Sequence, residues 1–179
     1  MLQLDGSPHR WNGEDEWALI TLIDDATSTI PFARFSLSET TWDCMDVLKE
    51  AISRYGIPEF ILTDQAGWSK RTGKRAYFSQ FERACKELGI TVIATSTPET
   101  KGRVERSFRT AQDRLIPELR LHDIKILTDA NRYLDQVYLP EWNKLFTVAP
   151  QSPATRYRPV PVSVDLDEVF CLKYTRQVN

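Results

Sequence analysis

The chain has 179 residues, of which 41% are hydrophobic and 27% are charged. These proportions are close to those of soluble globular domains, so they exclude a wholly disordered or fibrous chain. The longest apolar run, residues 18–23, is interrupted by Thr21 and is far shorter than the roughly 20 residues that span a membrane. Three scattered cysteines and the lack of a signal-peptide pattern predict a reduced, cytoplasmic protein without membrane association.

The net charge of −2 conceals an uneven distribution along the chain. Residues 1–64 carry 12 acidic and 4 basic side chains, a net charge of −8. Residues 65–179 carry 13 acidic and 19 basic side chains, a net charge of +6. This asymmetry is compatible with a metal site beside a surface for a polyanion, and equally with two ordinary solvated faces.

Apolar periodicity and turn-forming residues predict three strands, followed by alternating helices and strands. We expect the first three strands at residues 1–5, 16–24 and 30–35, with turns at residues 5–8 and 24–28. The elements that follow are a helix from Ser38 to Gly56, a strand at 60–64, a helix at 77–88, a strand at 90–94, a long helix from Pro98 or Gly102 to about Leu121, and a helix from Thr128 to Leu139 that Pro140 stops.

This order of elements predicts an α/β fold with a ribonuclease H-like mixed five-stranded sheet flanked by helices. We assign residues 1–146 to this domain. Four prolines fall within residues 150–161, which is typical of an extended arm. Residues 147–179 are therefore interpreted as a Pro-rich arm and the beginning of a truncated C-terminal segment, with one strand within residues 165–179.

Three acidic residues are expected to converge at one edge of the sheet. Asp5 ends the first strand and Asp64 ends the fourth, and these strands are neighbours in the predicted order. Glu105 follows the core residue Val104 on the long helix, so its side chain can lean toward the same edge. Converging carboxylates repel one another unless a cation binds, and Mg²⁺ prefers oxygen ligands. With 25 acidic residues in the chain, spacing alone is a weak signal.

The hypothesis of a metal site formed by these three carboxylates is supported by four stretches and their order along the chain: LDGSPH at residues 4–9, IDDAT at 23–27, LTD at 62–64 and KGRVER at 101–106. Together they resemble the catalytic core of insertion-sequence transposases and retroviral-type integrases. The similarity is greatest to bacterial transposases of the ISNCY group. It extends over residues 5–143, and residues 165–170 resemble the start of the family's small C-terminal domain.

The resemblance implies a polynucleotidyl transferase whose catalytic and metal-binding triad is Asp5, Asp64 and Glu105. These residues would hold two Mg²⁺ or Mn²⁺ ions for metal-dependent phosphodiester cleavage and strand transfer at transposon ends. The implied partners are DNA, as transposon ends and target, and further copies of the chain in a homo-oligomer. The implied location is the bacterial cytoplasm, in association with the nucleoid. Two alternatives remain open: a ribonuclease H-like nuclease that only hydrolyses, and a non-catalytic DNA-binding module derived from a transposase.

Basic residues occur in a predicted loop and around Glu105. The loop also carries Trp68, as a segment that follows a DNA backbone would, although a solvated connection has the same composition. For the second group we favour phosphate contacts over an ordinary charged helix face with a Glu105–Arg109 ion pair. The predicted DNA-binding residues are Lys70, Arg71, Lys74, Arg75, Lys101, Arg103, Arg106 and Arg109. Asp24 and Asp25 are assigned a structural role, because hairpin turns favour Asp.

Overall fold

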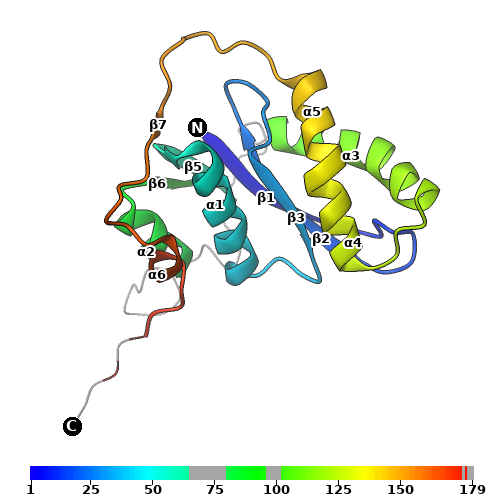
Figure 1. The fold of residues 1–179 in the computed structure, drawn as a ribbon, viewed down its shortest axis with the longest axis horizontal. Helices are drawn as coiled ribbons and strands as arrows, with labels where there is room; N and C mark the ends of the chain where they lie inside the picture. The colour runs from blue at the N-terminus through cyan, green and yellow to red at the C-terminus, as the bar shows by residue number, and fades with distance from the viewer. Residues whose placement is uncertain (65–79, 96–101, 175, 177–179) are drawn as a thin grey trace.

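The computed structural model describes residues 1–64, 80–95, 102–174 and 176. A five-stranded mixed sheet forms its centre, in the order β3-β2-β1-β5-β6 (Figure 1). The first three strands are antiparallel neighbours, whereas the last two run parallel to β1. The strands are β1 (Leu2–His9), β2 (Trp17–Asp24), β3 (Phe32–Ser36), β5 (Phe60–Thr63) and β6 (Thr91–Ala94). The predicted mixed five-stranded sheet is thereby confirmed.

Helices cover both faces of this sheet (Figure 1). One face packs against α1 (Thr41–Tyr55), α2 (Gln80–Glu87) and the short α6 (Leu166–Val169). The other face packs against α3 (Gly102–Leu121), α4 (Leu127–Tyr133), the π-helical turn η2 (Leu134–Tyr138) and α5 (Leu139–Phe146). No helix among the described residues is long and apolar enough to cross a membrane.

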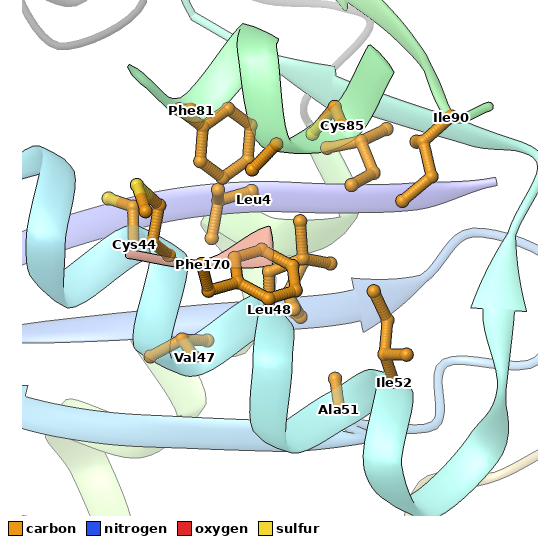
Figure 2. Close-up of a cluster of buried hydrophobic side chains, with 14 of the residues drawn as sticks. Leu4, Cys44, Val47, Leu48, Ala51, Ile52, Phe81, Cys85, Ile90 and Phe170 are labelled. Atoms are coloured by element: carbon orange, nitrogen blue, oxygen red, sulfur yellow. The ribbon is translucent and has the colours of Figure 1, made fainter. Parts of the chain in front are cut away.

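Strand alternation divides the apolar side chains between two cores, because successive residues of a strand point to opposite faces. Leu4 and Leu22 belong to the core beneath α1 and α2, which Figure 2 shows. Leu19 and Phe35 belong to the core beneath α3, α4 and α5. All eight residues of β2 are buried, as expected for a strand that helices cover on both faces.

Strand β1 is longer than predicted, and the turn expected at residues 5–8 is wrong. The antiparallel register with β2 continues through Gly6 and Pro8 to His9. Among the described residues, β1 pairs with β5 only at Leu2 and Gln3. Pro8 therefore lies where β1 has one neighbour, a position that tolerates the missing N–H of proline. In consequence, Asp5 lies within β1 rather than at its end.

Two predicted helix boundaries are also wrong. Thr40, not Ser38, caps α1, because its side-chain oxygen accepts from Asp43 N at 3.2 Å. Pro140 does not stop the helix before it, since α5 continues to Phe146. The π-helical turn lies just before Pro140, and its hydrogen bond from Leu139 N to Leu134 O spans five residues instead of four. This change in the hydrogen-bond pattern accommodates the missing N–H of Pro140.

The proline-rich arm returns to the domain and is held there. Its strand β7 (Tyr157–Arg158) pairs with β4 (Ile57–Pro58), and Arg158 Nη2 donates to Leu88 O at 2.7 Å. This approach requires a glycine at position 56, which has a φ of +94° and where a Cβ atom would lie 2.6 Å from Arg158 O.

The tail beyond the arm forms a helix where a strand was predicted. Asp165 caps α6 by accepting from Asp167 N at 2.8 Å, which favours a helical turn over an extended strand. Phe170 is then buried among side chains of α1 and α2 (Figure 2), and Val169 belongs to the same buried cluster. The apolar core beneath α1 therefore includes residues from the far end of the chain.

We predict that Phe170→Ala lowers the free energy of unfolding by about 3 kcal/mol, the scale for removing a buried aromatic side chain. Phe170 is 4% exposed, whereas Leu172 is 43% exposed and provides the matched control. Leu172→Ala should change stability by no more than about 0.5 kcal/mol. Urea denaturation of both variants measures the difference, and equal stabilities would contradict the docking of the tail.

Candidate active site

The register between β1 and β5 brings two of the predicted catalytic residues together. Leu2 pairs with Ile61 and Gln3 pairs with Leu62 in parallel orientation. Continuing this register by two residues sets Asp5 opposite Asp64, which directly follows β5. Both side chains are half-buried. Asp64 follows the carboxyl end of β5, and Asp5 lies within β1 just beyond its parallel pairing with β5, on the side of the sheet where open α/β sheets bind their ligands.

The thiol of Cys44, in the first turn of α1, is close enough to this pair to be influenced by both charges. Burial raises the pKa of Cys44, and the negative charges of Glu39, Asp43, Asp64 and Asp5 raise it further. The beginning of α1 and the ends of β1 and β5 therefore share one acidic neighbourhood. Because the thiol stays protonated at neutral pH, it is no nucleophile for this site.

Glu39 is a neighbour of the site that sequence reasoning missed. Its carboxylate lies directly over Gly6, where a Cβ atom would come within 2.3 Å of Glu39 Oε2. Glycine therefore gives this acidic side chain room over β1. The sequence carried no periodic signal for the contact, because Glu39 lies in the link between β3 and α1.

Glu105 lies in the first turn of α3, and its side chain is exposed. Among residues 1–64, 80–95, 102–174 and 176, no three His, Cys, Asp or Glu side chains form a group that could hold a metal ion. The structure thus brings Asp5 and Asp64 together but does not gather Glu105 with them. The chemistry of the donors fits a hard divalent cation, since all three predicted ligands are carboxylates.

The first turn of α3 is attached directly to β1. The buried side chain of Gln3 accepts from Val104 N through Oε1 at 3.0 Å. Its Nε2 atom donates to Asp25 Oδ1 at 2.7 Å. Sequence reasoning missed this connection, although a polar residue between Leu2 and Leu4 in a buried strand is an available signal.

The predicted DNA-binding residues have different environments. Arg106 and Arg109 are exposed on α3, and Arg109 forms no ion pair with Glu105, both residues being described. Arg103 instead engages the turn after β2: its Nη1 donates to Ser28 Oγ, and its Nε lies 3.5 Å from Asp25 Oδ1. The remaining predicted contacts lie outside the described residues: Lys70, Arg71, Lys74, Arg75 and Lys101.

Asp24 has the structural contacts that its place in a turn predicts. Its Oδ1 accepts from Ala26 N at 2.8 Å, and its Oδ2 accepts from Tyr157 OH at 3.2 Å. Burial and the Asp24 charge both raise the pKa of Tyr157, so this phenol remains a donor at neutral pH. Asp24 therefore links the turn to the C-terminal arm rather than to the Asp5–Asp64 pair.

A cleft of about 600 Å³ lies at the start of β1. Its walls are Met1 and Leu2, the Pro58–Glu59 pair before β5, the turn after β2, Arg103 and residues 150–157 of the arm. Charges of both signs line it, from Asp25 and Glu59 to Arg103 and Arg156. This cleft is separate from the neighbourhood of the two aspartates.

Solved structures of retroviral integrases share this fold. The simian T-cell lymphotropic virus intasome, in complex with the PP2A regulatory subunit B56 gamma, contains a chain that aligns with a TM-score of 0.64 and 20% identity, over 91% of this chain and 57% of that one. The catalytic core of HTLV-2 integrase in complex with magnesium aligns with a TM-score of 0.55 and 21% identity, over 76% of this chain and 86% of that one. The ribonuclease H-like fold is thereby confirmed.

Curated transposases are related to the chain in sequence. A candidate transposase of Sinorhizobium fredii, y4bF, is 34% identical over the whole chain, and the transposase for insertion sequence IS1202 of Streptococcus pneumoniae is 39% identical over 82% of it. The chain is thus similar to transposases in sequence and to retroviral integrase catalytic cores in fold. It spans 40% and 32% of the lengths of these two relatives. No protein-family model matches the chain.

Proposed function

We propose that the chain is the catalytic core of a DNA transposase, which performs metal-dependent phosphodiester cleavage and strand transfer at transposon ends. The observation that carries this proposal is the parallel pairing of Leu2 with Ile61 and of Gln3 with Leu62, which Asp5 and Asp64 each follow two residues later. The relationship to curated transposases supports it independently of the geometry. We assign Glu105 as the third member of the triad, because it lies on the helix that Gln3 attaches to β1.

In this proposal Asp5, Asp64 and Glu105 hold two Mg²⁺ or Mn²⁺ ions. One HTLV-2 integrase core of the same fold was solved with magnesium. Bound divalent ions supply Lewis-acid stabilisation of the attacking and leaving oxygens at phosphorus. The chain's own contribution is to fix three carboxylates on two strands and one helix, which is rigid support for a site that must hold its geometry.

The reaction itself is an in-line displacement at a DNA phosphodiester. In cleavage, a water oxygen bonds to phosphorus, the 3′ ester oxygen departs with a proton, and a free 3′-hydroxyl results. In strand transfer, that hydroxyl attacks a phosphodiester of the target and the ester oxygen of the target departs. Arg106 and Arg109 are exposed on the helix that carries Glu105, and in this proposal they hold the backbone phosphates.

The proposed partners are transposon-end DNA, target DNA and further copies of the chain. Related structures include an intasome and integrase cores in dimeric and trimeric forms, which supports a homo-oligomer. The four basic residues of the 68–75 stretch are proposed as a second backbone contact, on the strength of their composition alone. Arg103 is a weaker candidate, because the turn after β2 engages its guanidinium group.

We predict that Asp5→Asn, Asp64→Asn and Glu105→Gln each reduce cleavage and strand transfer in the full-length protein by at least about a hundredfold, the scale for losing one preorganised electrostatic group. Each substitution keeps the shape of the side chain and removes one charge. Asp113→Asn, on an exposed position of the same helix as Glu105, is the matched control and should retain activity. Gel assays with intact and pre-cut transposon ends measure both steps.

Wild-type activity in any one of the three variants would contradict the triad. Cleavage without joining of a pre-cut end would favour the hydrolytic nuclease. DNA binding without cleavage in Mg²⁺ or Mn²⁺ would favour the non-catalytic module.

We also predict how DNA affinity depends on salt. Each phosphate contact by a basic residue releases counterions, so log K falls with log salt by about 0.9 per contact on duplex DNA. Replacing Arg106 and Arg109 with Ala should flatten the slope by nearly two, and replacing Lys70, Arg71, Lys74 and Arg75 should flatten it by three to four. Fluorescence-anisotropy titrations measure both slopes. Arg132→Ala, at an exposed position of α4, is the control. An unchanged slope in either set of variants would exclude the altered segment from the DNA-binding surface.

A further inference from the structure

The turn between β2 and β3 receives contacts from distant parts of the chain. Asp25 accepts from Gln3 of β1 and faces Arg103 of α3. The Trp142 indole of α5 donates to Ser28 O at 3.1 Å. Ser28 itself has a φ of +63°, an uncommon conformation for a residue with a side chain, and several neighbours hold it there. The turn is therefore a junction between the central strand and the helices of one face.

Gln3 satisfies a backbone group that α3 cannot satisfy by itself. The N–H groups in the first turn of a helix have no acceptor within the helix. The Gln3 side chain supplies one for Val104 N across 101 positions of the chain. Because Gln3 is 2% exposed, water does not compete for this bond. The bond fixes the start of α3 against β1.

This hydrogen bond joins the strand that carries Asp5 to the helix that carries Glu105, two members of the proposed triad. Gln3 and Asp5 are two residues apart on one strand, so they occupy the same face of the sheet. Val104 immediately precedes Glu105 on α3. The hydrogen bond that Val104 N donates to Gln3 Oε1 therefore connects the strand that carries Asp5 to the turn that carries Glu105.

Asp25 determines which way the Gln3 amide is turned. A side-chain amide has one accepting and one donating end. Asp25 Oδ1 accepts from the Nε2 end at 2.7 Å, which leaves the Oε1 end for Val104 N. Arg103 Nε, 3.5 Å from the same oxygen, balances the charge of Asp25.

We propose that Gln3 and Asp25 are positioning residues, which hold the first turn of α3 so that Glu105 reaches the Asp5–Asp64 pair. This inference rests on the proposed function, since it requires Glu105 to act with the two aspartates. Neither residue touches the reacting atoms in this proposal.

Substitutions at Gln3 and Asp25 distinguish the loss of the Val104–Gln3–Asp25 hydrogen bonds from a general loss of stability. Gln3→Met keeps the volume of the side chain but removes both bonds. Gln3→Glu keeps an acceptor for Val104 N but sets a second carboxylate against Asp25, where like charges repel. In the double variant Gln3→Glu with Asp25→Asn, the asparagine amide donates to the new carboxylate, and the total charge equals that of the wild type. This double variant should restore the chain of bonds.

The experiment measures hydrogen–deuterium exchange in the first turn of α3, together with cleavage kinetics, in the full-length protein. We expect Gln3→Met and Gln3→Glu to accelerate exchange at Val104 and to lower kcat about 10- to 100-fold, with KM for DNA unchanged. The double variant should recover both values. Asp24→Asn is the matched control, because Asp24 binds the arm and the turn rather than α3.

Two results would overturn the inference: unchanged exchange at Val104 in Gln3→Met, or accelerated exchange with wild-type kcat. A double variant no better than Gln3→Glu alone would also overturn it. Failure of the proposed function would look different: either the wild type would not cleave DNA, or Glu105→Gln would remain active, whatever happens at Val104.

Discussion

The parallel pairing of β1 and β5 is the constraint on which the candidate site depends. Leu2 pairs with Ile61 and Gln3 pairs with Leu62, and Asp5 and Asp64 each follow two residues after the second of these pairs. The charges of both aspartates act on the buried thiol of Cys44, so the two side chains share one acidic neighbourhood. Like charges in one neighbourhood are costly at reduced dielectric, which favours the binding of a cation there.

The packing that fixes this register lies in the core beneath α1 and α2. Leu4 and Ile61 are fully buried in the core beneath α1 and α2, so neither strand can shift by one residue without exposing its apolar side chains. The first turn of α1 also lies near the pair, as the effect of both aspartates on Cys44 shows. The positive end of that helix partly offsets the local negative charge. A bound divalent cation would offset the rest.

Much of the sheet and of its helices could be predicted from the sequence, because alternation and amphipathic spacing carry that information locally. The apolar run of β2 and the stripe of α3, including Phe108 and Leu115, are of this kind. Turn-forming residues predict the ends of strands and helices less reliably. Gly6 and Pro8 predicted the end of β1, but pairing with β2 along its whole length outweighed their local preference. The helix end predicted at Pro140 is also wrong, because the π-helical turn before it lets the helix continue through α5.

The parts of the site that could not be predicted depend on contacts between distant residues. The approach of β1 and β5, which carry Asp5 and precede Asp64, follows from strand order, but the hydrogen bond from Val104 N to Gln3 Oε1 joins residues 101 positions apart. A glutamine in a strand carries no sign of its partner until the fold is known. The same holds for Glu39 above Gly6, where only the three-dimensional path of the β3–α1 link reveals the contact.

The metal ligands can be observed directly. A crystal structure of the protein soaked with Mn²⁺ and measured at the manganese absorption edge would locate the ions by anomalous scattering. We expect anomalous peaks bounded by the carboxylates of Asp5, Asp64 and Glu105, with Glu105 turned toward the two aspartates. Peaks absent from this edge of the sheet, or ions held without Glu105, would contradict the assignment of the three carboxylates as one metal-binding triad.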